Sequence, residues 1–166
     1  MKEIWFDDGL LSTYTTAFPV LKERDLIGHI ALVTGLVGGE FYSRIRKTTQ
    51  PCMNIDQLRE LVDADWEIAS HTVTHPFLFN RLSLEETRWE LTESKQWIEE
   101  NLGVTPTKFV VPRHLIRKKQ MALAKEVYSY VRPIAPGNTP YPPWLLVYHW
   151  VEGPNWLRRR LDRGES

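Results

Sequence analysis

The chain has 166 residues, 42% of them hydrophobic and 25% charged, a composition typical of one soluble globular domain that excludes global disorder. Lys plus Arg number 21 and Asp plus Glu number 21, so no net charge favours nucleic acid or an anionic membrane as a partner. Cys52 is the single cysteine, which excludes an intrachain disulfide. The sequence has no signal segment and no apolar run of membrane-spanning length, so we expect a soluble cytoplasmic protein, with a processed or trimmed secreted domain as the alternative.

Short apolar runs alternate with longer amphipathic segments in the first half, which favours an α/β organisation. Strands are predicted over residues 4–6, 29–33 and 66–70. A first helix is predicted over residues 13–24, where Pro19 bends it or delays its start. A loop containing Gly35, Gly38 and Gly39 follows the second strand, and Asn54 is the predicted cap of a helix that runs to about residue 62.

The second half continues this alternation. Ser83 and Glu86 form a capping box for a helix that runs to about residue 101, where Gly103 ends it. The remaining predictions are a strand over residues 108–112, a helix over 117–130, a proline-rich loop over 133–143 and a strand over 144–150. Residues 1–152 are predicted to form one folded domain, and the basic residues 153–166 a solvated C-terminal tail.

Two clusters of side chains carry groups that are suited to catalysis or metal binding. Asp7 and Asp8 end the first strand, where adjacent carboxylates repel each other unless a cation lies between them. His71 and His75 are four residues apart, a spacing that puts two imidazoles on one side of either a helix or a strand. Each cluster has an ordinary structural interpretation when taken alone, namely a turn or helix cap for the first and two unrelated histidines for the second.

The two clusters together predict a metal site. One carboxylate and two imidazoles are a ligand set suited to Zn²⁺, Fe²⁺, Co²⁺ or Mn²⁺ that leaves positions open for water and substrate. A second carboxylate beside that water is placed to take its proton. Both clusters follow predicted strands, and catalytic groups in α/β barrels gather at the carboxyl ends of the strands.

Residues 6–9, Phe-Asp-Asp-Gly, and residues 65–75, Asp-Trp-Glu-Ile-Ala-Ser-His-Thr-Val-Thr-His, carry a resemblance to a known family. They resemble the first and second motifs of the polysaccharide deacetylases, the N-deacetylases of chitin and peptidoglycan. The resemblance implies that Asp7 is the catalytic base and that Asp8, His71 and His75 hold one divalent metal, with Zn first and Co, Fe, Mn or Ni as alternatives. The metal would polarise the acetamide carbonyl, and Asp7 would deprotonate the attacking water.

The later motifs depart from the family pattern. Val110 occupies the position of the family's usual Arg, and Arg113 replaces its usual aromatic residue. Pro112 and Arg113 are the candidate substrate or oxyanion residues, with a surface arginine as the alternative. Residues 145–149, Leu-Leu-Val-Tyr-His, resemble the last motif, which makes His149 the candidate acid for the leaving amine or, alternatively, a packing residue. No Asp lies between Arg113 and His149 to orient that histidine.

The family resemblance implies an α/β fold, a distorted and incomplete (β/α) barrel trimmed to five or six strands.

The leading function is metal-dependent removal of an N-acetyl group from an amino sugar or N-acetylated glycan, with that carbohydrate as the partner and no nucleic acid or membrane. The alternatives are a metal- or carbohydrate-binding relative with little turnover, a metal-independent C–N hydrolase of the same superfamily and, last, a binding module that uses the basic tail. An oligomer that covers an open sheet edge is compatible with this fold. His29 and His114 match no motif.

Overall fold

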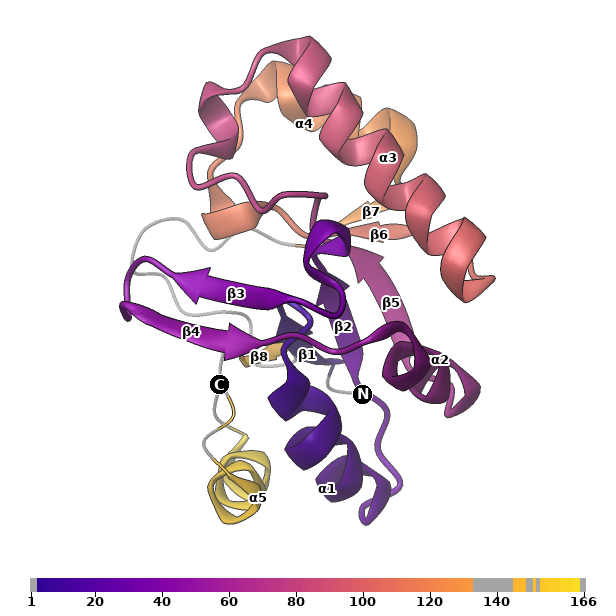
Figure 1. Cartoon of the computed structure of the whole chain (residues 1–166), viewed down its shortest axis with the longest axis vertical. Helices are drawn as coiled ribbons and strands as arrows, with labels where there is room; N and C mark the ends of the chain where they lie inside the picture. The colour runs from indigo at the N-terminus through magenta and orange to yellow at the C-terminus, as the bar shows by residue number, and fades with distance from the viewer. Residues whose placement is uncertain (1–2, 133–144, 149–150, 152, 165–166) are drawn as a thin grey trace. The chain divides into compact units, whose positions relative to one another are not determined.

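A computed structural model describes residues 3–132, 145–148, 151 and 153–164 of the chain (Figure 1). It divides into two compact units: Met1–Ile30, Val37–Glu67 and Tyr141–Ser166 form the first, and Ala31–Leu36 and Ile68–Pro140 form the second. Six strands hydrogen-bond in the order β7-β6-β5-β2-β1-β8. They are β1 (Glu3–Asp7), β2 (His29–Leu32), β5 (Glu67–Ser70), β6 (Lys108–Phe109), β7 (Tyr130–Val131) and β8 (Leu145–Tyr148). The predicted α/β class is confirmed, with six strands in this sheet among the described residues.

In the first unit, the buried strand β1 pairs in parallel with β8, and Glu3 lies opposite Leu145 in the register. The segment after β1 forms one π-helical turn over Thr13–Ala17 before α1 (Phe18–Lys22) begins. Pro19 lies in the first turn of α1, where its missing N–H costs no hydrogen bond. The helix predicted over residues 13–24 is therefore helical over residues 13–22, with its first five residues in a π-helical rather than an α-helical conformation.

The core of the first unit is aromatic. The Phe6 ring stacks on Trp66 at 5.6 Å, and Phe18 meets the same indole edge-on at 5.8 Å. A Cβ atom at Gly28 would lie 2.5 Å from the Trp66 ring, so only glycine leaves room for it. Trp66 therefore joins β1 to α1 through apolar contact.

α2 (Ile55–Asp63) begins where the sequence predicts. Asn54 accepts a hydrogen bond from the Gln57 backbone N–H, and the Gln57 side chain accepts one from the Asn54 N–H, each at 2.9 Å. Ahead of α2 lies an antiparallel hairpin that the sequence did not indicate, β3 (Glu40–Ser43) paired with β4 (Thr48–Pro51). It occupies part of the segment expected to be a glycine-containing loop.

The predicted solvated tail is wrong in one respect, because its residues form helix α5 (Pro154–Arg163). Leu157 is fully buried, and α5 contacts α1 and the π-helical turn. Arg158 donates to both carboxylate oxygens of Glu23, at 2.9 and 2.7 Å. An amphipathic helix thus forms because one apolar residue packs inward while its arginines face water and acidic partners.

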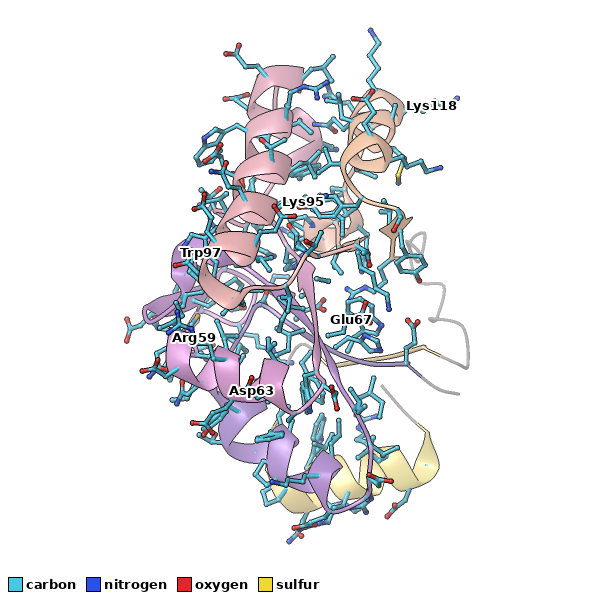
Figure 2. All side chains as sticks on the ribbon, turned by 90° about the vertical axis from the view of Figure 1, so that its right-hand side faces the viewer. Arg59, Asp63, Glu67, Lys95, Trp97 and Lys118 are labelled. Carbon is cyan, nitrogen blue, oxygen red and sulfur yellow. The ribbon has the colours of Figure 1, made fainter. Side chains whose placement is uncertain are left out.

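In the second unit, α3 (Leu84–Leu102) is the longest helix that the structure describes, and it packs along α4 (Lys118–Val127) (Figure 1). The predicted capping box of Ser83 and Glu86 is present, and Gly103 ends α3 in the left-handed conformation with φ 70°. The Lys95 side chain extends from α3 (Figure 2). Its Nζ atom donates to the Val127 carbonyl oxygen at the end of α4, 3.0 Å away.

The helices of the second unit cover a buried cluster formed by Phe79, Leu91, Phe109, Val111, Leu123, Ala124 and Tyr128. β5, β6 and β7 pair in parallel beneath it. Two predictions are wrong in their bounds here. The strand predicted over residues 108–112 stops at Phe109, and the helix predicted over 117–130 ends at Val127. Tyr128 turns extended to fill the cluster, which places Tyr130 in a strand.

The proline-rich loop predicted over residues 133–143 and residue 149 lie outside the described residues. Residues 145–148 form β8 within the strand predicted over residues 144–150. In the part of the chain that is described, no helix combines the length and the apolar composition needed to cross a bilayer.

Candidate functional site

The turn after β1 buries two carboxylates. The Asp7 side chain is 3% exposed and Asp8 is 8% exposed. Asp8 and Gly9 both adopt positive φ, 71° and 72°, and the Met53 N–H donates to the Gly9 carbonyl oxygen at 2.9 Å. This tight turn ends β1 and fixes the backbone of Asp8. Adjacent buried carboxylates favour a cation in their surroundings.

His71 follows β5 directly and is 2% exposed. Its backbone N–H donates to the Leu32 carbonyl oxygen at 2.8 Å, and its Nδ1 atom lies 2.8 Å from the Val110 carbonyl oxygen. A carbonyl oxygen only accepts, so Nδ1 carries the proton. The lone pair then lies on Nε2, the usual arrangement of a metal-binding histidine.

Residues 71–75, which we call the histidine loop, are held by their own turn and by a neighbouring backbone. Thr72 and His75 both have positive φ, 74° and 52°, and the His75 N–H donates to the Thr72 Oγ1 atom at 3.0 Å. The N–H groups of Thr34 and Gly35 donate to the carbonyl oxygens of Thr72 and Val73, at 3.2 and 2.9 Å. These bonds stabilise a backbone conformation that is unfavourable for non-glycine residues.

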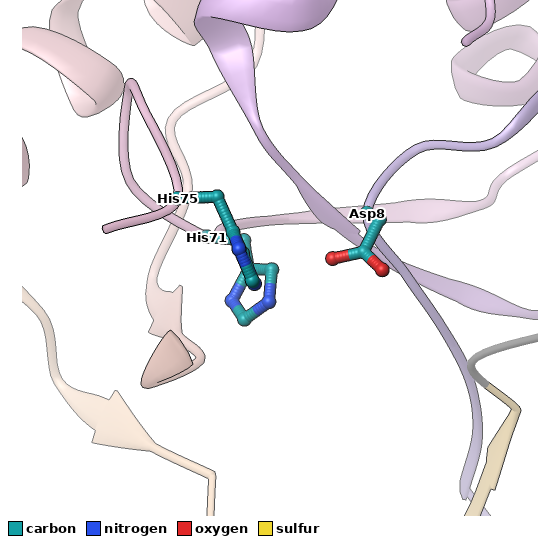
Figure 3. Close-up of side chains that lie close together, drawn as sticks. All are labelled: Asp8, His71 and His75. Atoms are coloured by element: carbon teal, nitrogen blue, oxygen red, sulfur yellow. The ribbon is translucent and has the colours of Figure 1, made fainter. Parts of the chain in front are cut away.

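Asp8, His71 and His75 each offer one ligand atom, and these atoms lie within 4.8 Å of one another (Figure 3). The two imidazole rings are 4.8 Å apart between centroids and inclined by 61°. One carboxylate and two imidazoles, one of them with its tautomer set by a carbonyl, fit a divalent ion such as Zn²⁺.

Pro112 and Arg113 lie in a short 3-10 turn that follows β6. Arg113 has φ 53°, and its guanidinium carbon lies 3.9 Å from the centre of the Phe77 ring, two residues after His75. A guanidinium over an aromatic face is a favourable cation–π contact. The substrate or oxyanion role of Pro112 and Arg113 stays a prediction.

The remaining histidines lie outside this group of three ligands. His29 stacks on the Trp5 ring at 4.8 Å, and its Nδ1 atom lies 2.8 Å from a Glu67 carboxylate oxygen, so it makes structural contacts in the first unit. His114 lies in the turn after β6 and received no role from the sequence. The catalytic role of Asp7 stays a prediction, and His149 is outside the described residues.

A family model described as polysaccharide deacetylase matches residues 3–129. The chain belongs to the polysaccharide deacetylase family. The match spans the first two motifs, the histidine loop and α3. No curated protein matches the chain.

Several solved structures of polysaccharide deacetylases are similar to this member. A Streptococcus pyogenes deacetylase, PplD, in complex with acetate is 18% identical with a TM-score of 0.67, over 99% of this chain and 70% of the other. The BpsB deacetylase domain from Bordetella bronchiseptica is 25% identical with a TM-score of 0.69, over 89% and 69% of the two chains. A mutant of a CE4-family pseudoenzyme with restored activity is 17% identical with a TM-score of 0.72, over 100% and 64%.

These comparisons confirm the predicted fold class, the incomplete (β/α) barrel of polysaccharide deacetylases.

Proposed function

We propose that this polysaccharide deacetylase is a metal-dependent hydrolase that removes an N-acetyl group from an amino sugar or N-acetylated glycan. The observation that carries the proposal is the group of Asp8, His71 and His75, whose ligand atoms lie within 4.8 Å of one another. This donor set occurs in a chain that belongs to a deacetylase family.

Asp8, His71 and His75 would hold the ion, with Zn²⁺ first and Co²⁺, Fe²⁺, Mn²⁺ or Ni²⁺ as alternatives. When bound, the ion supplies Lewis-acid polarisation of the acetamide carbonyl and lowers the pKa of a nearby water. The hydrogen bond from His71 Nδ1 to the Val110 carbonyl supports this role, because it keeps Nε2 unprotonated.

Asp7 is the proposed general base. It is buried beside Asp8, and it would take the proton of the water that attacks the carbonyl carbon. The turn at Pro112 and Arg113 would offer a backbone N–H to the oxygen that becomes negative. As the C–N bond breaks, His149 would protonate the leaving amine, and acetate would be the second product.

A second candidate is a relative of the same fold that binds metal or carbohydrate with little turnover. Two features of the sequence favour it: Val110 stands at the family's usual Arg position, and no Asp lies between Arg113 and His149. One of the similar structures is an activity-restored mutant of a protein described as a CE4-family pseudoenzyme, which supports this second candidate. A metal-independent C–N hydrolase is less favoured, because the three-residue donor set is complete.

Acetate release from N-acetylated chito-oligosaccharides tests the proposal. We expect release by the wild-type protein loaded with Zn²⁺ or Co²⁺, loss of release in Asp7→Asn, and one bound ion per chain in both proteins. A His114→Ala variant is the control, because His114 has no proposed role. Unchanged release in Asp7→Asn would show that another residue is the base. Metal binding without release in the wild-type protein would favour the second candidate.

A further inference from the structure

The side chain of Glu90, on α3, is the most unusual buried group near the histidine loop. It is 4% exposed and carries a carboxylate, which is rarely buried without partners. The N–H groups of Val73 and Thr74 donate to its Oε2 atom at 2.7 and 3.0 Å, and the Thr74 hydroxyl donates to Oε1. The backbone of the loop thus forms an anion-binding concavity that Glu90 fills.

Both donating amides lie between the two histidines. Val73 and Thr74 are the third and fourth residues of the histidine loop, so their N–H groups set the path of the chain from His71 to His75. The loop needs such support because Thr72 and His75 have positive φ. Charged acceptors form stronger hydrogen bonds than neutral ones, which suits Glu90 to holding a strained backbone.

Helix α3 is a rigid support for this carboxylate. Its first turn is capped by Ser83 and Glu86, and Gly103 closes its last turn. Ser94, one turn after Glu90, lies within hydrogen-bond distance of Ser70, the residue before His71, with 2.7 Å between the two hydroxyl oxygens. α3 therefore contacts the chain both just before the first histidine and between the two histidines.

We propose that Glu90 is a positioning residue that holds the histidine loop in the conformation in which His71 and His75 present their ring nitrogens to one ion. Glu90 does not touch the ion. It acts through the amides of Val73 and Thr74. Its contribution is measured as the affinity of the protein for the metal ion. The inference rests on the metal site of the proposed function, but not on turnover.

Titration of the metal-free protein with Co²⁺, followed by its visible absorption, tests the role without any assay of activity. In Glu90→Ala the two amides lose their acceptor, and we expect Co²⁺ affinity to fall by at least about tenfold, the usual effect of losing a partner that orients metal ligands. Glu90→Asp keeps the charge but moves the carboxylate away from the two amides, because its side chain is one CH₂ group shorter. We therefore expect Co²⁺ affinity to fall in this variant too. Glu90→Gln keeps an oxygen for both amides, so its affinity should stay above that of Glu90→Asp.

Gln120→Ala is the matched control. Gln120 is 1% exposed, lies in the same unit and donates from Nε2 to the carbonyl oxygens of Phe79 and Leu82, at 2.8 and 3.2 Å. Removing it also breaks buried hydrogen bonds and lowers stability, but these bonds do not reach the histidine loop. We expect Co²⁺ affinity in Gln120→Ala within about twofold of the wild-type value, since no group that orients a ligand is lost.

Three outcomes separate the ideas. Wild-type affinity in Glu90→Ala and Glu90→Asp would overturn the positioning role and leave the metal site standing. Equal losses in Glu90→Ala and in Gln120→Ala at equal loss of melting temperature would also overturn it, since a general loss of stability would then explain both. Absence of Co²⁺ binding by the wild-type protein would overturn the metal site itself and the positioning role with it.

Discussion

The Val110 carbonyl oxygen accepts a hydrogen bond from His71 Nδ1 at 2.8 Å. Val110 stands where related deacetylases are expected to carry an Arg, yet this contact uses only its backbone. This hydrogen bond to His71 therefore needs no functional group in the side chain at position 110. Backbone carbonyls are common partners of metal-binding histidines.

This bond predicts the tautomer of His71. In the metal-free protein at neutral pH, we expect the neutral imidazole to carry its proton on Nδ1, because the Val110 carbonyl accepts only from a protonated nitrogen. Two-bond ¹⁵N–¹H correlation spectra of the ring measure this directly. A His71 ring protonated on Nε2 would contradict the assignment of Nε2 as the metal-binding atom.

Gly35 is predicted to be irreplaceable beside the histidine loop. A Cβ atom at this position would lie 2.6 Å from the Val73 carbonyl oxygen, which the Gly35 N–H itself contacts. In Gly35→Ala the loop must move or the hydrogen bond must break, and we expect a loss of about 1–3 kcal/mol in the free energy of unfolding. Chemical denaturation measures this loss.

The matched substitution is Gly153→Ser, because a Cβ atom at Gly153 meets nothing within 4 Å and serine is a good residue at a helix N-cap. It should leave both stability and Co²⁺ affinity unchanged, whereas Gly35→Ala should lower both. If Gly35→Ala bound Co²⁺ like the wild-type protein, the histidine loop would tolerate a shift of its neighbouring backbone.

The raised pKa of Tyr128 predicts that the folded protein loses stability at alkaline pH. Burial raises the pKa of Tyr128 from 10.0 to about 12, and its hydroxyl donates to the Leu91 carbonyl oxygen at 2.7 Å. Below pH 10 the phenol is neutral in both the folded and the unfolded chain, so its full contribution to stability is present. Between pH 10 and 12 the unfolded chain releases this proton and the folded chain does not, so stability falls as pH rises.

Tyr128→Phe isolates this effect. At pH 8 we expect Tyr128→Phe to be less stable by about 1 kcal/mol, because one hydrogen bond is lost. Toward pH 12 the wild-type protein should lose up to about 3 kcal/mol relative to Tyr128→Phe. Urea unfolding of both proteins across this range is the measurement. Parallel pH profiles would mean that Tyr128 is accessible to solvent in the folded state.

Helix α5 should depend on Leu157 rather than on its arginines. Leu157 is fully buried, so Leu157→Ala should cost about 2–5 kcal/mol. Arg158 and its partner Glu23 are 34% and 53% exposed, and Arg158→Ala should cost less than about 1 kcal/mol. Thermal unfolding at low and at 0.5 M salt checks both values. A larger loss in Arg158→Ala than in Leu157→Ala would show that charge holds the helix.

Much of the fold could be predicted because its signals are local. The capping pairs of Asn54 with Gln57 and of Ser83 with Glu86 lie three residues apart, so the start of each helix can be predicted from a few letters. β1 and β5 are short apolar segments whose buried residues follow one another in the chain. The motif residues Asp8, His71 and His75 carry ligand chemistry in their identity, and their ligand atoms lie together.

The hairpin of β3 and β4 could not be predicted because neither strand buries a face: β3 alternates only between exposed and half-buried side chains, and β4 is mostly exposed. Tyr42 is 57% exposed, Ile45 is 74% exposed, and the residues of β4 are mostly exposed. Alternating hydrophobicity, the usual signal of a strand, depends on burial of one face.

The groups that support the histidine loop could not be predicted from the sequence for another reason. Val110 acts through a carbonyl oxygen 39 residues from His71, and Glu90 lies 17 residues beyond Val73. A backbone atom has the same chemistry in every residue, so no letter of the sequence marks it. A glutamate in the middle of a helix is ordinarily a solvated residue, and only the tertiary structure shows that Glu90 is buried.

The pairing of β1 with β8 has a consequence for the order in which the chain acquires its structure. Glu3 of β1 pairs with Leu145 of β8, which lies more than a hundred residues later in the sequence. Residues 68–132, by contrast, make contacts among themselves through α3, α4, β6 and β7. During synthesis this later segment can form contacts while β1 still lacks β8, so the strand that carries Asp7 gains this partner only after residues 68–132 have been made.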